Sequence, residues 1–400
     1  MSTRKDIRRR RHTAAYSGTA VAERAQNGYT LAQEARILED SEYTAELPGG
    51  GRRGGTDACA KAAVKSLPGA AFLAFPGMAG MLRAELAGRF GFQSAPAAEY
   101  GELLYFPDFP APADGGADAG SKPSAGTPDA LPYWAKSALL SPKEITFPSI
   151  GSGAAALRAI QRSWAPYSYQ HFRRTALIQE KLPHVNMKAR RFPVEIPTSP
   201  IGLYTLLGKT TMLASESTGR ILPAGHIAFE EDHENPPSRA YLKLQEGLAM
   251  AAALDGAEIP HAGQRCFEAG ACPGGWTWVL TNLGADVVAV DRTELAPALM
   301  GSPLVTFLRH DAFTLTPQEV GRCDWVFSDV ICYPERLYAW ALGWLESGLA
   351  ENMLCTIKMQ GAPNWDVIRR FAEIPGSRIV HLNYNKHELT WLHTARRAGI

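Results

Sequence analysis

The chain has 400 residues, 46% of them hydrophobic and 20% charged, as in an ordinary globular protein with room for two or three domains. With 41 Lys and Arg against 40 Asp and Glu, the formal net charge is +1, so the overall charge excludes a generally basic surface and any basic patch must be local. The six cysteines show neither Cys-x-x-Cys spacing nor a Cys/His ligand set, which indicates reduced thiols and no metal centre. No apolar run reaches the ~18 residues that cross a bilayer and no secretory signal is present, so we expect a cytoplasmic protein without a membrane partner.

Residues 1–65 predict a disordered basic tail. Arg4, Lys5 and the arginines at 8–11 are followed by Gly- and Arg-rich stretches with few large apolar side chains. Such a segment cannot bury enough apolar surface to offset the entropy of ordering. Its arginines could contact RNA phosphates, although a solvated tail without a partner is the simpler interpretation.

Residues 66–225 predict an α+β module, because strand-like and helical patterns follow one another without strict alternation. The expected strands are 71–75, 103–106 and 144–147, with further strand-like pieces at 193–196 and 221–229, and the expected helices are 81–90 and 154–162. From 107 to 132, Pro, Gly, Ala, Ser and Asp dominate, which indicates a flexible insertion.

This module contains a stretch rich in basic and aromatic residues. Its members are Trp164, Tyr167, Tyr169, Phe172, Arg173, Arg174, Lys188, Arg190 and Arg191. The rings could stack on bases and the cations could neutralise phosphates. Aromatic residues at such spacing are more often part of a core, so both interpretations stay open.

The clearest functional signal is a glycine-rich turn between a strand and a helix. The strand begins at Arg265 and the helix is expected to begin near Gly275. The turn and the helix start contain the residues predicted to bind a cofactor: Gly270, Ala271, Cys272, Pro273, Gly274, Gly275 and Trp276. Glycines allow close backbone approach, and the free N–H groups at a helix start favour an anionic group such as a carboxylate.

Carboxylates follow the ends of four predicted strands: Glu268, Asp291, Asp311 and Asp329. In an open parallel sheet these strand ends border one crevice, where an acid about 20 residues past the first glycine bonds ribose hydroxyls. Asp291 has this spacing. The alternative is that these acids are helix caps. Because Pro273 interrupts the G-x-G-x-x-G dinucleotide pattern, S-adenosylmethionine is favoured over NAD.

Residues 270–276 resemble the cofactor motif of the FtsJ-type ribose 2′-O-methyltransferases, Gly-Ala-(Ala/Cys)-Pro-Gly-Gly-Trp. Stretches 238–244, 356–361 and 387–390 extend the resemblance, which covers about residues 226–397. It implies a Rossmann-like α/β domain over residues 226–400, S-adenosyl-L-methionine as cofactor, and a catalytic tetrad. By motif, the tetrad is Lys243, Asp329, Lys358 and Glu388.

Within the family, the Ala-Cys-Pro-Gly-Gly-Trp-Thr variant and the long N-terminal extension are most similar to members that methylate a cytidine ribose of large-subunit (23S) ribosomal RNA. In those members the extension is a ferredoxin-like and THUMP-related RNA-binding region, which implies an RNA partner here. Two departures stand out. Glu268 replaces the usual Asp of Asp-Leu-Gly, and Val-Ile-Cys-Tyr-Pro follows Asp329 in place of Met-Ala-Pro, which puts the target nucleotide in doubt.

The resemblance implies an in-line methyl transfer to a ribose hydroxyl, whose proton must leave as the new bond forms. Lysine, with a reference pKa of about 10.4, is a poor base unless burial or a nearby cation lowers that value. We expect Lys358 to act as base, with Lys243 as the neighbouring cation. Asp329 should orient Lys358, and Glu388 should position Lys243 and the hydroxyl.

Two other functions remain open. Asn235-Pro236-Pro237 is similar to the Asn-Pro-Pro-aromatic element of amino-methyltransferases, which would make this a permuted relative. However, Ser238 stands where that chemistry needs an aromatic ring, and it could instead cap a helix. The other alternative is a non-catalytic RNA-binding or ribosome-assembly factor that keeps the fold. The oligomeric state does not follow from the sequence.

Overall fold

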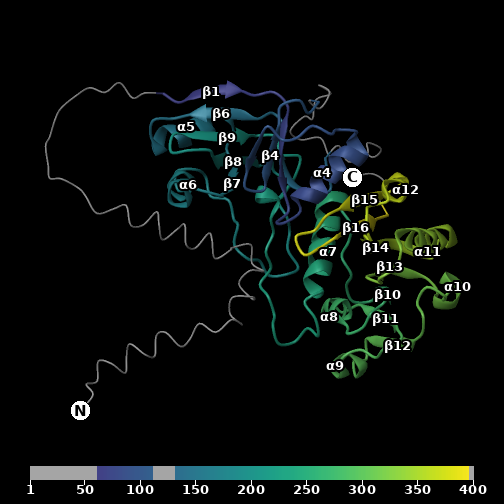
Figure 1. Cartoon of the computed structure of the whole chain (residues 1–400). Helices are drawn as coiled ribbons and strands as arrows, with labels where there is room; N and C mark the ends of the chain where they lie inside the picture. Colours follow the sequence, from purple (N-terminus) through teal and green to yellow (C-terminus); the bar gives the residue numbers. More distant parts are fainter. Residues whose placement is uncertain (1–60, 111–130, 396–400) are drawn as a thin grey trace, which may run out of the picture.

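The structure is a computed structural model that describes residues 61–110 and 131–395. Most of the predicted tail and of the predicted insertion lies outside these ranges. The described residues form three sheets of four, five and seven strands. The two smaller sheets belong to the N-terminal module and the large sheet to the C-terminal domain (Figure 1). Within the described ranges, no helix is long and apolar enough to cross a membrane.

The four-stranded sheet has the order β3-β4-β2-β5 and is antiparallel throughout. Its strands are β2 (Ala70–Ala74), β3 (Ala98–Tyr100), β4 (Leu103–Phe106) and β5 (Ala135–Leu139). Helix α4 (Ala79–Phe90) follows β2 and ends at Gly91, whose positive φ of 65° suits a residue without a side chain. Every residue of β2 is buried, which explains its uninterrupted apolar sequence.

The five-stranded sheet has the order β1-β6-β9-β8-β7. Its elements are β1 (Ala63–Ser66), β6 (Lys143–Thr146), α5 (Ile150–Ile160), β7 (Trp164–Pro166), α6 (Phe172–Gln179), β8 (Gly202–Leu206) and β9 (Thr211–Ser215). The Ser149 hydroxyl caps α5 by accepting from the backbone N–H of Ser152. The ring nitrogen of Trp164 donates to the Leu157 carbonyl at 2.9 Å, and this tryptophan is fully buried. Of the two interpretations left open for the basic and aromatic stretch, Trp164 therefore supports the core one.

The described residues of the N-terminal module form both strands and helices, but three segments differ from the expectation. Residues 63–65, assigned to the tail, belong to β1 because they pair with β6. Residues 193–196 and 221–229, expected to be strand-like, form no regular strand in this described region. Only a single bridge joins Arg190 to Phe229, and a 3-10 turn, η3, spans Pro223–Gly225. Each segment contains one proline, Pro193 or Pro223, and a proline cannot donate a ladder hydrogen bond.

The seven-stranded sheet has the order β12-β11-β10-β13-β14-β16-β15. The five strands from β12 to β14 are parallel, and β16 runs antiparallel to both neighbours. The strands are β10 (Arg265–Ala269), β11 (Asp286–Asp291), β12 (Val305–Arg309), β13 (Cys323–Ser328), β14 (Ala350–Lys358), β15 (Ser377–Val380) and β16 (Glu388–His393). The helices are α7 (Tyr241–Asp255), α8 (Gly275–Asn282), α9 (Pro297–Met300), α10 (Pro317–Val320), α11 (Pro334–Ser347) and α12 (Trp365–Glu373).

Helices cover both faces of this sheet, which is why its central strands are mainly apolar. Along β13, Trp325 and Phe327 pack in the cluster that contains α7 and α8, whereas Val326 packs in the cluster that contains α11 and α12. Helix α7 lies close to β14, since a side chain at Gly247 would approach a Leu354 methyl to 2.6 Å. This close packing fixes the position of α7 over the sheet.

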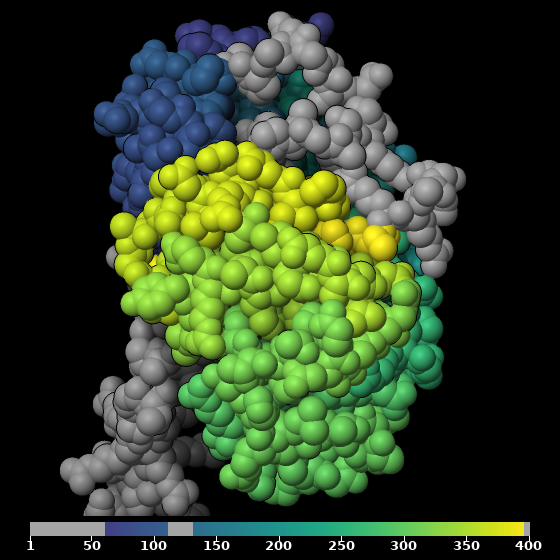
Figure 2. Space-filling model, turned by 90° about the vertical axis from the view of Figure 1, so that its right-hand side faces the viewer, coloured from purple at the N-terminus to yellow at the C-terminus, as the bar shows by residue number. Residues whose placement is uncertain are grey.

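The N-terminal module and the C-terminal domain share one apolar cluster, which includes Phe72 and Trp134 of the first and Ile368 and Trp391 of the second. Helix α4 packs on α12 so closely that a side chain at Gly88 would lie 2.2 Å from the Trp365 ring nitrogen. Figure 2 shows the N-terminal residues (blue) directly against the C-terminal ones (yellow). The two parts are therefore joined by a packed core.

Candidate active site

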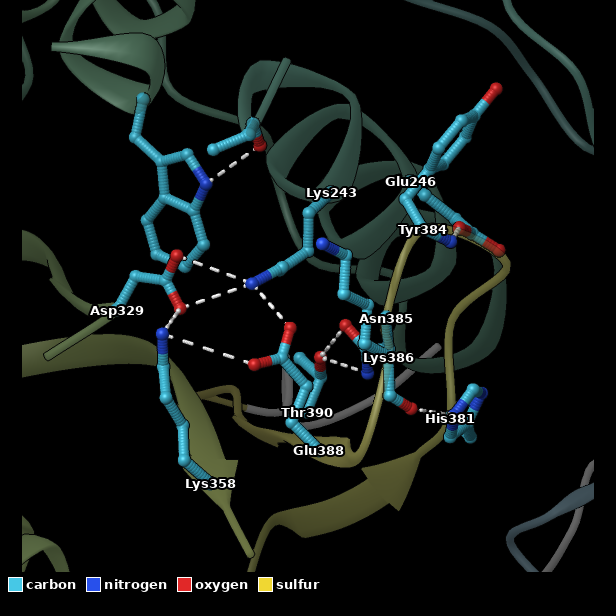
Figure 3. A network of polar contacts seen from close by, with 12 residues as sticks. Lys243, Glu246, Asp329, Lys358, His381, Tyr384, Asn385, Lys386, Glu388 and Thr390 are labelled. Carbon is cyan, nitrogen blue, oxygen red and sulfur yellow. Dashed lines mark hydrogen bonds and ion pairs between the residues drawn. The ribbon is translucent and has the colours of Figure 1, made fainter. Parts of the chain in front are cut away.

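The four predicted catalytic side chains come from four separate elements. Lys243 lies in the first turn of α7, Asp329 directly follows β13, Lys358 ends β14 and Glu388 begins β16. The antiparallel register of β14 and β16 sets Lys358 opposite Glu388. Figure 3 shows both amines pointing toward the two carboxylates between them. Residues separated by up to 145 positions thus meet at one end of the sheet.

The distances define a compact network of charged groups. Lys243 Nζ lies 3.1 and 3.2 Å from the two oxygens of Asp329 and 2.5 Å from Glu388 Oε1. Lys358 Nζ lies 3.0 Å from Asp329 Oδ1 and 3.8 Å from Glu388 Oε2. Both amines therefore contact the same oxygen of Asp329, whereas Glu388 is held mainly by Lys243.

Burial and charge act in opposite directions on these groups. Burial alone would lower the pKa of Lys243, but Asp329 and Glu388 raise it above its ordinary value. Burial alone would raise the pKa of Asp329, but the two lysines hold it below its ordinary value. Lys243 is accordingly a persistent cation and Asp329 a persistent anion. The side chain of Lys243 is 8% exposed and that of Lys358 is 19% exposed, so Lys358 is the more accessible amine.

The glycine-rich turn has the predicted position between β10 and α8. Gly270 has φ of +78°, and a side chain there would approach a Val330 methyl to 2.5 Å. Gly274, the residue before α8, has φ of +109°. Both positions therefore require glycine. The backbone N–H of Cys272 donates to Asp291 Oδ2 at 3.0 Å, so the acid at the end of β11 holds the turn directly.

Glu268 is a buried carboxylate beneath this turn, at 3% exposure. Burial raises its pKa to about 8, and the negative charges of Asp329 and Asp291 act in the same direction. The hydroxyl of Thr277 donates to Glu268 Oε2 at 2.6 Å. Because burial and these two charges favour the protonated form of Glu268, a cationic ligand nearby would favour its ionised form, which suits the sulfonium and ammonium charges of S-adenosylmethionine.

The remaining predicted cofactor residues differ in their surroundings. The backbone N–H of Ala271 donates to Val290, and Pro273 follows a cis peptide bond. Gly275 begins α8, as predicted, and Trp276 is buried with its ring nitrogen donating to the Ala240 carbonyl at 2.9 Å. Asp311 lies outside the acidic group, because Arg292 and Arg336 pair with it.

Other candidate sites receive less support. The side-chain amide of Asn235, which would bind a base in an amino-methyltransferase, donates to Asp232 at 2.7 Å. No group of three metal-ligating side chains occurs in the described ranges, and the five cysteines described there are free; Cys59 lies outside them. A cavity of about 220 Å³ is lined by Ser163 and by residues of the 184–228 region, among them Lys188 and Arg190 of the basic stretch, and by none of the predicted catalytic or cofactor-binding residues.

Residues 236–361 match the model of the FtsJ-like methyltransferase family. This match confirms the predicted resemblance to that family and the predicted Rossmann-like fold of the C-terminal domain.

Curated relatives carry the name Ribosomal RNA large subunit methyltransferase M. The relative from Xylella fastidiosa (strain 9a5c) is 35% identical over 169 residues, which cover 42% of this chain and 46% of the relative. The relative from Halorhodospira halophila is 37% identical over 125 residues, which cover 31% and 36%. The matched part is therefore about half of these relatives or less.

The sequence patterns did not identify two residues that lie near the site. Glu246, one turn beyond Lys243 on α7, is 1% exposed, and Thr277 binds Glu268. The three-residue spacing from Lys243 to Glu246 could have indicated that both face the same side of a helix. Nothing in the sequence marks this glutamate as buried, since glutamate on a helix is usually solvated.

Proposed function

We propose that this chain is an S-adenosylmethionine-dependent RNA ribose 2′-O-methyltransferase that acts on large-subunit ribosomal RNA. The observation that carries the proposal is the convergence of Lys243, Asp329, Lys358 and Glu388 beside the glycine-rich turn. This arrangement suits removal of a proton from a ribose hydroxyl next to a cationic cofactor. The resemblance of residues 236–361 to FtsJ-like methyltransferases supports the same chemistry.

The cofactor would supply a methyl group on a positively charged sulfur. Asp291 would bind its ribose, and the acidic group formed with Glu268 and Asp329 would favour its positive charge. The turn from Gly270 to Trp276 would approach it through backbone atoms.

The two amines would have different tasks. Lys243 contacts both acids closely and has a raised pKa, so it would remain the cation that orients Glu388 and Asp329. Lys358 has one short contact, to Asp329, and is the more exposed of the two. It would accept the hydroxyl proton of the RNA.

The substrate assignment rests on the curated relatives, whose printed name specifies the large ribosomal subunit. We propose that the N-terminal module contacts this RNA and that the protein acts in the cytoplasm. Arg173, Lys188 and Arg191 are exposed there and could neutralise phosphates, whereas Trp164 is part of the core. The ferredoxin-like and THUMP-related assignment of this module also remains a prediction.

Mass-spectrometric mapping of ribose methylation in ribosomal RNA tests the proposal. RNA from cells that lack the gene should lose one 2′-O-methyl group, and the purified full-length chain with S-adenosylmethionine should restore it. A non-catalytic assembly factor would give no methyl incorporation in the purified reaction. Methylation of an exocyclic base amine would support the amino-methyltransferase alternative and overturn the ribose assignment.

A further inference from the structure

Glu246 is a buried acid that the proposed chemistry does not use. It lies on α7, one turn beyond Lys243, and is 1% exposed. Its Oε1 accepts from the backbone N–H of Asn383 at 3.0 Å and from the side-chain amide of Asn383 at 2.7 Å. Its Oε2 accepts from the backbone N–H of Tyr384 at 3.2 Å. One carboxylate thus binds three donors of a single turn.

That turn belongs to the segment 381–387, which joins β15 to β16 and leads directly into Glu388 (Figure 3). The side-chain amide of Asn385 donates to the Thr390 hydroxyl at 3.0 Å, which ties the segment to β16. Lys243 and Glu246 therefore act on the same segment from adjacent turns of one helix. Lys243 binds Glu388, the residue directly after the segment, and Glu246 binds Asn383 and Tyr384 within it.

The N-terminal module contacts the same segment from the other side. The buried ring of His381 lies 4.1 Å from the Phe75 ring and 5.9 Å from the Trp134 ring, measured between centroids. His381 Nε2 lies 3.0 Å from the Lys386 carbonyl, which bridges the two ends of the segment. The amide of Asn383 also donates to the Gly225 carbonyl at 3.3 Å. The segment is consequently fixed on both faces.

We propose that Glu246 is a positioning residue for the tetrad, which holds the 381–387 segment against α7 and so sets the distance between Glu388 and Lys243. This inference deepens the proposed function and rests on it. Glu246 acts through the segment and does not touch the substrate. Because transfer depends on near-attack geometry, a shift of about 1 Å in Glu388 can lower turnover by roughly a hundredfold.

The chain offers a matched control on the same helix. Asp255, the last residue of α7, accepts from Arg378 at 2.8 Å and ties the helix to β15. Its side chain is 3% exposed, so Asp255→Asn disturbs a buried acid of α7 without touching the 381–387 segment. Glu246→Ala removes all three acceptor contacts. Glu246→Gln can keep the oxygen that accepts from Asn383, so it should restore part of the function.

The experiment compares wild type, Glu246→Ala, Glu246→Gln and Asp255→Asn as purified full-length chains. Hydrogen–deuterium exchange of the peptide that contains residues 383–388 reports on the segment independently of activity. Turnover on ribosomal RNA, KM for RNA and Kd for S-adenosylmethionine are measured in parallel. For Glu246→Ala we expect at least about tenfold faster exchange in this peptide and about tenfold to hundredfold lower kcat, with KM and Kd within about threefold.

Glu246→Gln should lie between wild type and Glu246→Ala in both measurements, and Asp255→Asn should match wild type in both even where its melting temperature falls. Unchanged exchange in Glu246→Ala would overturn the inference, as would faster exchange with kcat within twofold of the Asp255→Asn value. Absence of methyl transfer by the wild type would refute the proposed function and with it the catalytic part of the inference. The exchange result would then decide separately whether Glu246 holds the segment.

Discussion

Replacement of Lys358 by methionine tests the role of the proposed base while the two acids keep their contacts with Lys243. Methionine keeps an unbranched chain of similar length but has no amine, so it cannot accept a proton. In the Lys358→Met variant, Lys243 still lies 3.1 and 3.2 Å from the two oxygens of Asp329 and 2.5 Å from Glu388. Asp329 and Glu388 therefore each keep a positively charged partner, Lys243.

The contacts set the expected magnitudes. Loss of the partly exposed Lys358 contact should cost only about 1 kcal/mol of unfolding free energy. Loss of a general base should lower turnover by about 10² to 10⁴. Lys243→Met should behave differently, because it leaves Glu388 with only the distant Lys358 contact at 3.8 Å. Breaking a buried pair in this way should cost about 3–5 kcal/mol.

Single-turnover transfer of a labelled methyl group to ribosomal RNA measures the chemical step, and urea unfolding measures stability. Calorimetry should give a cofactor Kd for Lys358→Met within a few fold of wild type. The reasoning would be refuted if Lys358→Met kept turnover within tenfold of wild type. It would also fail if Lys243→Met were no less stable than Lys358→Met.

Three further predictions concern other acids. Asp291→Ala should raise the cofactor Kd at least about tenfold in calorimetry, because the acid that supports the turn and the proposed ribose contact is lost; an unchanged Kd would contradict this role. Burial raises the pKa of Glu268 from 4.5 to about 8, so the folded state binds more protons than the unfolded state between these values. Its contribution should therefore become increasingly unfavourable as pH rises from about 4.5 to 8, and Glu268→Gln should flatten this part of a plot of melting temperature against pH. Glu85 accepts from the backbone N–H groups of Tyr133 at 2.8 Å and Trp134 at 3.0 Å, so Glu85→Ala should lower the urea-derived unfolding free energy by about 2–5 kcal/mol. A loss below about 1 kcal/mol would show that these groups find other partners.

Much of the C-terminal domain could be predicted because its signals are local. The order of strand, glycine turn and helix around Gly270 depends on neighbouring residues, and the predicted strand 286–290 matches β11 almost to its ends. The position of Lys358 follows from the same topology, since parallel strands present their carboxyl ends at one edge of the sheet. Glu388 begins the antiparallel strand β16 and was predicted from the motif resemblance alone. The structure places these two residues opposite each other in the β14–β16 pair.

The N-terminal module was less predictable because its strands are short and its order is set by distant contacts. The hairpin of β8 and β9 was missed although Gly208 lies in its turn. Segment 193–196 has an alternating apolar pattern, and Val194 and Ile196 do pack against the core, but the segment joins no sheet. A periodic pattern reports which side chains are buried and cannot by itself supply a partner strand.

The shared core of Phe72, Trp134, Ile368 and Trp391 has a consequence for how a large substrate is selected. If an RNA binds the N-terminal module, the distance from its binding surface to Lys358 is fixed by the shared core, because no flexible linker separates the two parts within the described core. The target nucleotide would then be selected by its distance from the part of the RNA that the N-terminal module binds. The sequence around the target would matter less than this distance.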